Sequence, residues 1–288
     1  MTVWTLGSIN IDLVYDVPHL PGPGETLAAR SLTRGLGGKG ANMAVAAARA
    51  GSHVVQIAAV GADGKWTVDR LTEYGVDTRF IAQVDEPTGH AMIAVDAEAE
   101  NLIIILGGAN RVVPMDAVGR ALTEASPGDI FLTQNETNGQ VEAARMARDL
   151  GLRVAYAAAP FEAEAAKAML PLADLLFLNQ VEAAQLQAAT GWSPEALPVT
   201  DVIVTMGARG CRWHGPDGTR DFPAVPVTPV DTTGAGDTFT GYVVAGLDRG
   251  LPMPQAIAQA LRAAAIMVTR HGTADVIPDL KDVLDGSA

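Results

Sequence analysis

Short apolar runs alternate along most of the chain with alanine-rich stretches that are long enough to form helices. The apolar runs end near Gly, Asn, Thr or other turn formers and have the length of buried strands. Glycines such as Gly51 and Gly151 stop the alanine-rich stretches. We expect strands at residues 3–6, 54–60, 130–133, 154–157, 175–178 and 202–205, and helices that include residues 41–50 and 141–150. This alternation predicts an α/β fold around a largely parallel sheet.

Two stretches interrupt the alternation with strand-like runs that have no helix between them. Residues 11–34 are rich in Pro and Gly, and residues 88–106 contain apolar runs at 91–95 and 102–106. Both stretches are typical of antiparallel strand pairs. We expect a small sheet that stands off a single α/β domain spanning residues 1–288. Such a sheet can cover a site as a lid, or its edge can pair with a second copy of the chain.

Composition and charge narrow the function classes. The chain has 288 residues, of which 48% are hydrophobic and 18% are charged, a balance typical of a globular protein with a sizeable core. Its formal net charge of -13 opposes binding to nucleic acids and to anionic membranes, so we expect small-molecule partners. An anionic nucleotide would then depend on backbone N–H groups, a metal ion or a few local cations.

The number of cysteines and the lengths of the apolar segments indicate the cellular compartment in which we expect the protein. Cys211 is the single cysteine, which excludes an intramolecular disulfide and a zinc site built from several thiolates. No uncharged apolar stretch approaches the roughly 20 residues of a membrane helix, and the first residues do not resemble a signal peptide. We therefore expect a cytoplasmic protein.

A first glycine cluster, at residues 35–42, opens directly into an expected helix. The spacing of Gly35, Gly37 and Gly40 matches a dinucleotide-binding fingerprint, but the polar segment 29–34 is not the apolar strand that this fingerprint requires. A Walker A loop is excluded because Gly40, and not Ser or Thr, follows the lysine. The favoured interpretation is a loop whose glycines let the backbone approach a polar ligand closely.

Polar side chains near this cluster suit a carbohydrate. Lys39 and Asn42 can form hydrogen bonds with hydroxyl groups. Asn10 and Asp12 follow the first expected strand, at the edge where open α/β sheets bind ligands. The alternative is that Asn10 and Asp12 merely cap a turn.

A second glycine cluster, at residues 230–239, is the most informative segment. It runs Val-Asp-Thr-Thr-Gly-Ala-Gly-Asp-Thr-Phe from extended residues into an expected helix. The first N–H groups and the positive dipole end of that helix form an anion hole for phosphate oxygens. Asp237 lies in its mouth, either as an ordinary N-terminal helix charge or as a base that faces an acceptor hydroxyl beside a phosphoryl group.

These segments together resemble the PfkB carbohydrate kinase family, and within it the ribokinases. The matches follow in order over nearly the whole chain, at residues 7–14, 37–51, 108–110, 179–182, 202–210 and 230–241. The resemblance implies a ribokinase-like three-layer α/β/α domain with a small β-sheet lid formed by about residues 11–34 and 88–106. It also implies a homodimer that forms through this lid.

The same resemblance implies an activity and its cofactors. The expected reaction is ATP-dependent phosphorylation of a primary hydroxyl of a pentose, with D-ribose to ribose 5-phosphate as first choice and with Mg²⁺ and K⁺ as cofactors. One alternative is a PfkB-family kinase for a nucleoside, a ketohexose or a deoxy sugar acid. Another is a catalytically silent sugar-binding homologue.

The resemblance further implies roles for individual residues. It makes Asp237 the catalytic base, with the backbone of Gly234, Ala235 and Gly236 stabilising the charge on the transferred group. The expected sugar-binding residues are Asn10, Asp12, Gly38, Lys39, Asn42 and Glu136. The expected nucleotide-side residues are Asn179 and Glu182, which act on Mg²⁺ through water, with Thr205, Gly207 and Gly210. The expected K⁺ site comprises Asp231 and Thr233, with carbonyl groups near Arg270 and Gly272.

Three departures from the family pattern bear on nucleotide affinity and cation dependence. Ala157-Ala158-Ala159-Pro160 stands where family members often carry Asn-Pro-Ala-Pro, and residues 191–202 are too few for the usual helix. Val276 replaces a serine near the expected cation. A further candidate is His90, at the start of an expected lid strand, whose ring could touch the substrate.

Overall fold

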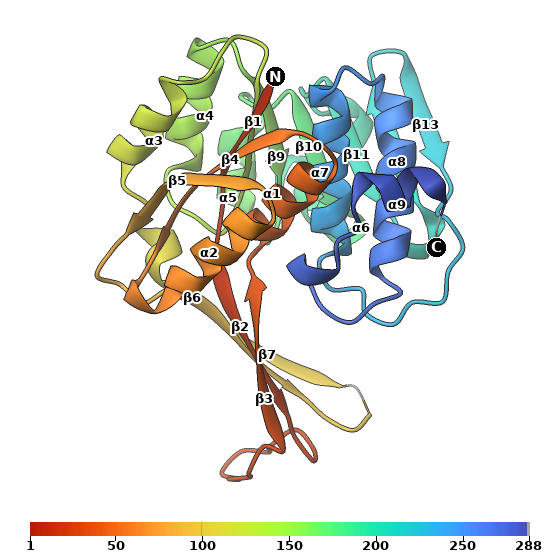
Figure 1. Cartoon of the computed structure of the whole chain (residues 1–288). Coiled ribbons are helices and arrows are strands. Elements are labelled where there is room, and N and C mark those ends of the chain that lie inside the picture. Colours follow the sequence, from red (N-terminus) through yellow and green to blue (C-terminus); the bar gives the residue numbers. More distant parts are fainter. Residues whose placement is uncertain (99, 287–288) are drawn as a thin grey trace.

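The computed structural model describes residues 1–98 and 100–286, and it has three layers, with helices on both faces of a large sheet (Figure 1). The strands are β1 (Thr2–Leu6), β2 (Asn10–Asp16), β3 (Ser31–Gly37), β4 (His53–Val60), β5 (Val76–Gln83), β6 (Gly89–Val95), β7 (Asn101–Leu106), β8 (Ile130–Gln134), β9 (Arg153–Ala157), β10 (Leu175–Asn179), β11 (Asp201–Thr205), β12 (Cys211–Gly215) and β13 (Gly218–Phe222). The helices are α1 (Lys39–Arg49), α2 (Lys65–Glu73), α3 (Met115–Leu122), α4 (Gln140–Asp149), α5 (Ala163–Met169), α6 (Gln180–Thr190), α7 (Ala235–Asp248), α8 (Met253–Met267) and α9 (Leu280–Asp285).

The large sheet has nine strands in the order β13-β12-β11-β10-β9-β8-β1-β4-β5. Its pairs from β5 to β11 are parallel, and the β12–β13 hairpin adds antiparallel pairs at one edge. Successive side chains of a strand point to opposite faces, so Val3 belongs to the core on the side of α1, α7 and α8, whereas Trp4 belongs to the core on the side of α3 to α6. Both faces are therefore buried, as the apolar strand runs predicted.

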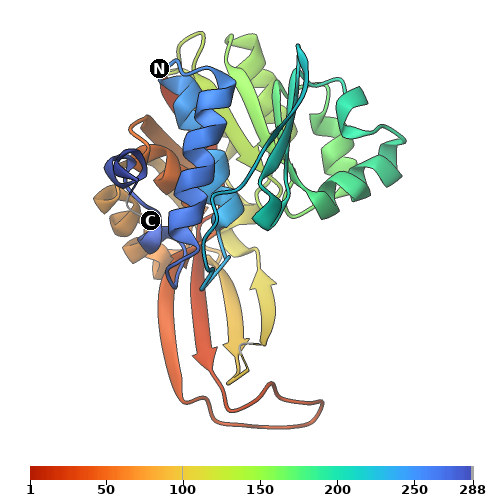
Figure 2. The same cartoon turned by 90° about the vertical axis from the view of Figure 1, so that its right-hand side faces the viewer.

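A second sheet, called the small sheet below, consists of β2, β3, β6 and β7 in the order β3-β2-β6-β7. The β2–β3 and β6–β7 pairs are antiparallel, and β2 lies parallel to β6. Figures 1 and 2 show the small sheet extending away from the main domain. Because β1 leads directly into β2, the small sheet starts at the carboxyl ends of the parallel strands.

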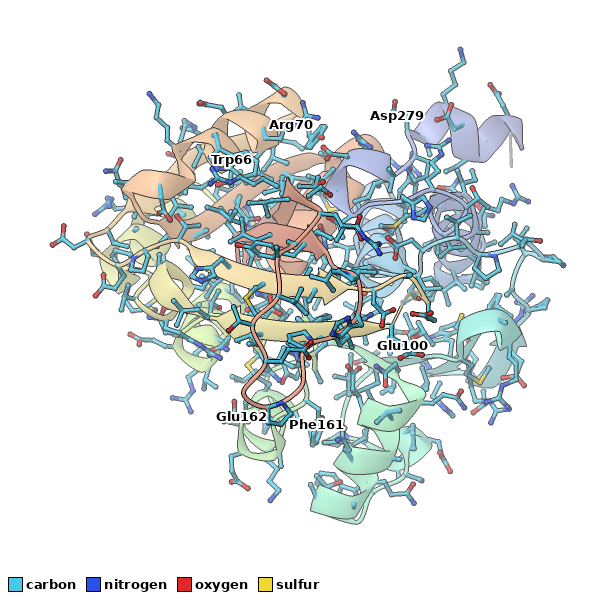
Figure 3. The ribbon with its side chains drawn as sticks, turned by 90° about the horizontal axis from the view of Figure 1, so that it is seen from below. Trp66, Arg70, Glu100, Phe161, Glu162 and Asp279 are labelled. Carbon is cyan, nitrogen blue, oxygen red and sulfur yellow. The ribbon has the colours of Figure 1, made fainter. Side chains whose placement is uncertain are left out.

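The underside of the molecule is the side from which the small sheet extends. Figure 3 shows its strands crossing the middle of this side. In that view Trp66 and Arg70 of α2 lie on one flank, and Phe161 and Glu162 lie on the other. Glu100 lies near one end of the β6–β7 pair. The small sheet is thus placed over the edge where ligands of open α/β sheets bind.

Other features of the sequence have structural counterparts. Cys211 is buried at the start of β12, where burial raises the pKa of its thiol to about 12, so it is an unreactive thiol. The short segment after Gly191 contains a single-turn 3-10 helix, Pro194–Ala196. In the described part of the chain, no helix has the length and apolar character needed to cross a membrane.

Candidate active site

A cavity of about 920 Å³ opens between the carboxyl ends of β10 and β11 and the helices α7 and α8. Sequence segments far apart in the chain meet in its wall. The residues predicted for nucleotide binding and catalysis that line it are Asn179, Glu182, Thr205, Gly207, Gly210, Gly234, Ala235, Gly236 and Asp237, and Lys39, which was predicted for sugar binding, lines it as well. The structure thus brings together the first and second glycine clusters and the 179–182 element around one space.

The start of α7 forms one end of this cavity. Gly234 precedes the helix with φ 77°, a left-handed conformation that glycine adopts without strain. A Cβ at Gly234 would lie 2.9 Å from Met267 Cε, so a side chain there would also meet α8. The N–H groups of the first turn point toward the cavity end that Ala235 and Gly236 line, which is the arrangement that binds anions.

Asp237 lies in the first turn of α7 and is only 7% exposed. Its Oδ2 accepts a hydrogen bond from Asn42 Nδ2 at 2.9 Å, and its Oδ1 lies 3.9 Å from Lys39 Nζ. Burial raises the pKa of Asp237, while the Lys39 ammonium and the Asn42 amide oppose that rise. The same carboxylate raises the pKa of Lys39, which keeps the ammonium charged. Asp237 is therefore a buried carboxylate with an increased proton affinity, held at the mouth of an anion-binding helix.

The predicted sugar-side residues form a polar cluster against Asp237. Glu136 Oε2 accepts hydrogen bonds from Ser8 Oγ at 2.5 Å and from the Lys39 backbone N–H at 3.2 Å. Asp12 projects from β2 toward the same place, and burial together with the charges of Glu136 and Asp237 raises the pKa of Asp12 to about 7. Three carboxyl groups thus face a small region where hydroxyl groups can donate hydrogen bonds to them.

Gly37 and Gly38 allow the glycine loop to approach β2 closely. Gly38 has φ 94°, and a Cβ there would lie 2.9 Å from the Asn10 backbone nitrogen. A Cβ at Gly37 would lie 2.1 Å from an Asp12 carboxylate oxygen. The glycine loop therefore packs directly against β2, while its approach to a ligand stays a prediction.

On the nucleotide side, Asn179 and Glu182 form a capping box at the start of α6. Asn179 Oδ1 accepts a hydrogen bond from the Glu182 backbone N–H at 2.9 Å, and Glu182 Oε2 accepts one from the Asn179 backbone N–H at 2.7 Å. Burial raises the pKa of Glu182. Gly210 has φ 92°, and a Cβ there would lie 2.0 Å from the Phe222 carbonyl oxygen, so this turn requires glycine.

The residues predicted for the cation lie on two adjoining loops. Asp231 accepts hydrogen bonds from the Thr233 backbone N–H at 2.9 Å and from the Gly272 backbone N–H at 3.2 Å. Arg270 donates to the Val276 carbonyl at 3.4 Å. Asp231 thereby joins the segment before α7 to the segment after α8.

The structure differs from the sequence-based expectation at His90 and adds an apolar wall to the cavity. Strand pairing sets His90 opposite Ile11, so by alternation its ring lies on the face of the small sheet opposite Asp12, and the expectation that His90 touches the substrate is wrong.

The apolar wall of the cavity, formed by Val225, Val227, Leu261, Ala264 and Val268, was not predicted. Leu261 and Ala264 of α8 and Val268, which follows it directly, recur with helical spacing. This pattern is equally typical of ordinary core packing.

Comparisons with known proteins agree with this geometry. The family model described as pfkB family carbohydrate kinase matches residues 2–280. A ribokinase of Haemophilus influenzae is 34% identical over 301 residues, covering 99% of this chain and 97% of the relative.

Two solved structures have the same fold. A ribokinase from Cryptococcus neoformans in complex with ADP is 31% identical, with a TM-score of 0.89 and 99% of both chains covered. An Arabidopsis thaliana ribokinase complexed with ribose and ATP is 27% identical, with a TM-score of 0.86, covering 99% of this chain and 97% of that one. The full-length family match and these similarities show that the chain belongs to the pfkB family of carbohydrate kinases.

Proposed function

We propose that this protein transfers the γ-phosphoryl group of ATP to the primary hydroxyl of a pentose, with D-ribose as substrate and ribose 5-phosphate as product. The observation that carries the proposal is the position of Asp237 between two unlike regions. On one side lies the large cavity that ends at the α7 N-terminus, and on the other lies the polar cluster of Asn10, Asp12 and Glu136. ADP bound by one similar ribokinase, and ribose and ATP bound by another, support this assignment.

Asp237 is suited to act as the general base. A carboxylate whose burial raises its pKa accepts a proton more readily than an exposed one. It takes the proton of the acceptor hydroxyl as that oxygen attacks phosphorus, and the bond between phosphorus and the ADP oxygen breaks in line. The Asn42 amide and the Lys39 ammonium fix the carboxylate in position.

The α7 N-terminus and Lys39 would stabilise the charge on the transferred group. Gly234, Ala235 and Gly236 line the cavity beside Asp237, and of their backbone N–H groups that of Ala235 also donates to the Thr232 carbonyl at 3.3 Å. Their partial positive charge is fixed before the reaction, so no reorganisation is required when charge develops on the phosphoryl oxygens.

The residues around the cavity are compatible with Mg²⁺ and K⁺. Among the described residues there is no cluster of three or more His, Cys, Asp or Glu side chains that would form a closed metal cage. Mg²⁺ bound to nucleotides takes one or two carboxylates, phosphate oxygens and water, and Glu182, which lines the cavity, would fit that requirement. The loops joined by Asp231 offer carbonyl oxygens, the ligands that suit K⁺, at Thr233, Arg270 and Gly272. When bound, the metal ions would neutralise charge on the phosphates.

The small sheet is suited to act as a lid and as a dimer interface. It stands at the edge of the sugar-side cluster and contributes Asn10 and Asp12 from β2. Its edge strand β7 exposes every residue from Leu102 to Leu106, all of them apolar, which is typical of a surface that a partner covers. We infer a homodimer that forms through the small sheet, and the use of ATP favours the cytoplasm.

A substrate screen tests the proposal. ADP release is measured for pentoses, hexoses and nucleosides, with K⁺ or Na⁺, for the wild type and Asp237→Ala. We expect D-ribose to give the highest kcat/KM, stimulation by K⁺, and loss of turnover in the variant. Turnover of a nucleoside without turnover of ribose would refute the pentose assignment. A sugar that raises Tm without any turnover would instead indicate a silent sugar-binding homologue.

A further inference from the structure

Asn110 is a buried side chain in the 3-10 helix Gly108–Arg111, only 1% exposed. Its Oδ1 accepts a hydrogen bond from the Ile9 backbone N–H at 2.9 Å, and its Nδ2 donates to the Ile9 carbonyl at 3.2 Å. A backbone N–H can only donate and a carbonyl can only accept, so Ile9 fixes which way the Asn110 amide points.

This fixed orientation determines the orientation of Asn10. Asn110 Nδ2 also donates to Asn10 Oδ1 at 2.8 Å. Because the group that Asn110 presents is a donor, Asn10 turns its oxygen toward Asn110 and keeps its own Nδ2 for another partner. In residues 1–98 and 100–286, no group accepts a hydrogen bond from Asn10 Nδ2, and this atom is not among the inaccessible unpaired ones.

Gly89 makes room for the bond between the two amides. It lies opposite Asn10 in the pairing of β2 with β6. A Cβ at Gly89 would lie 2.1 Å from Asn110 Nδ2 and 2.5 Å from Asn10 Oδ1. The contact therefore depends on three segments that meet where the small sheet joins the main domain.

The polar cluster beside Asn10 supplies mainly hydrogen-bond acceptors. Asp12, Glu136 and Asp237 all present carboxyl groups, and the Asn42 donor is already bonded to Asp237. A sugar hydroxyl that donates to a carboxylate still has lone pairs, and leaving them unpaired in a buried site lowers affinity. The Lys39 ammonium, 3.9 Å from Asp237, is one donor beside these carboxyl groups, and Asn10 Nδ2 would add a neutral donor with a fixed direction.

We propose that Asn110 is a positioning residue that sets sugar specificity by holding Asn10 with its Nδ2 toward the substrate. Asn10 then recognises a hydroxyl oxygen as acceptor and discriminates against a sugar that lacks it. This inference rests on the proposed sugar kinase function, since it specifies how one residue of that site is oriented.

The direct test is Asn110→Asp, which keeps the side-chain shape and the acceptor for the Ile9 N–H. The new carboxylate cannot donate, so Asn10 turns its Nδ2 inward and presents Oδ1 to the sugar. We expect KM for the sugar to rise about tenfold or more, while kcat and KM for ATP stay within about twofold. Gly89→Ala disrupts the same bond from the other side and should raise the sugar KM in the same way.

Asn138 provides a matched control. Its amide makes the same pair of bonds to one backbone residue, accepting from the Val113 N–H at 2.8 Å and donating to the Val113 carbonyl at 3.0 Å. Asn138→Asp should lower Tm to a similar extent as Asn110→Asp and leave the sugar KM unchanged. In an Asn10→Ala background, Asn110→Asp should have no further effect on that KM.

Two results would overturn the inference: a sugar KM that rises equally in Asn110→Asp and Asn138→Asp, or an undiminished effect of Asn110→Asp in the Asn10→Ala background. The comparison is made with the acceptor that the wild type uses best. If that acceptor is a nucleoside, the pentose assignment fails, while the variants still decide whether Asn110 acts through Asn10.

Discussion

Among single residues, the site concentrates acidic groups, and the surroundings of two of them, Asp12 and Asp237, raise the pKa of the carboxyl group. Asp12, Glu136 and Asp237 interact electrostatically, and burial adds to the effect at Asp12 and Asp237. A sugar with several hydroxyl groups can donate hydrogen bonds to all three carboxylates. Ligand binding would therefore replace mutual repulsion with favourable contacts, which makes the empty site the less stable form.

Asp12→Asn should stabilise the protein in a pH-dependent way. The pKa of Asp12 rises from an ordinary value of 3.8 to about 7 on folding, so the folded protein loses stability as the pH rises through this interval. We expect the free energy of unfolding of the variant to exceed that of the wild type by about 1 to 3 kcal/mol near pH 8 and by almost nothing near pH 4. Urea unfolding at both pH values measures this difference.

Asp16→Asn is the control for this prediction, since Asp16 is an exposed carboxylate on the same strand. It should change stability by less than about 0.5 kcal/mol at either pH. An Asp12→Asn variant that is no more stable than the wild type near pH 8 would show that Asp12 does not lie in the charged cluster described here.

At the scale of elements, the left-handed turn before α7 is the feature most sensitive to change. We expect Gly234→Ala to cost about 1 to 2 kcal/mol of stability, because alanine is strained at φ 77°. Its Cβ would also lie 3.5 Å from Asn42 Nδ2, the group that holds Asp237. We therefore expect kcat/KM to fall about tenfold or more, measured by ADP release.

Gly250 lies just beyond the other end of the same helix and separates the two effects. It has φ 82°, and no atom of the described residues would lie within 4 Å of a Cβ added there, so Gly250→Ala incurs the backbone strain alone. It should lose similar stability and keep its activity. Equal losses of activity in the two variants would mean that the α7 N-terminus has no special part in catalysis.

Elements could be predicted from the sequence where burial made the pattern unambiguous. Strands of the large sheet are apolar on both faces, and the expected run 54–60 corresponds to His53–Val60. In the small sheet, β6 and β7 carry apolar residues on both faces, so alternation within them gave no indication of which side His90 occupies, and only the pairing with Ile11 reveals it.

The site could be predicted best where its residues lie in glycine-rich motifs, and elsewhere from a position after the first strand or from the family resemblance. Asp237 and Lys39 were found in this way, and the structure places them 3.9 Å apart between Nζ and Oδ1. The role of Asn110 and the apolar wall contributed by α8 were not predicted, because a buried amide or an apolar helix face has the same sequence pattern in any protein core. Their roles depend on contacts with Asn10 and with the cavity, which periodicity does not encode.

In the molecule as a whole, the small sheet presents an apolar surface that none of residues 1–98 and 100–286 covers. Ile103, Ile104 and Ile105 are 52%, 56% and 60% exposed on β7, at the edge of that sheet. Such an edge favours association with a second copy of the chain. The lid and the dimer interface would then be parts of one structure.

Ile104→Lys should convert the dimer to a monomer, because a lysine would have to lose its hydration in the interface. Size-exclusion chromatography with light scattering measures the mass. Leu284→Lys is the control, since Leu284 is 55% exposed on α9, outside the small sheet. A wild type that is already monomeric, or an Ile104→Lys variant that remains dimeric, would exclude the small sheet as the interface.

We expect Asp237 to remove the proton from the sugar hydroxyl during phosphoryl transfer. The rate at which the Asp237→Asn variant forms ribose 5-phosphate measures the contribution of this proton transfer. The asparagine has the same shape, so we expect ATP affinity and Tm to be retained while kcat falls about 10²- to 10⁴-fold. A variant that forms ribose 5-phosphate at close to the wild-type rate would contradict the account.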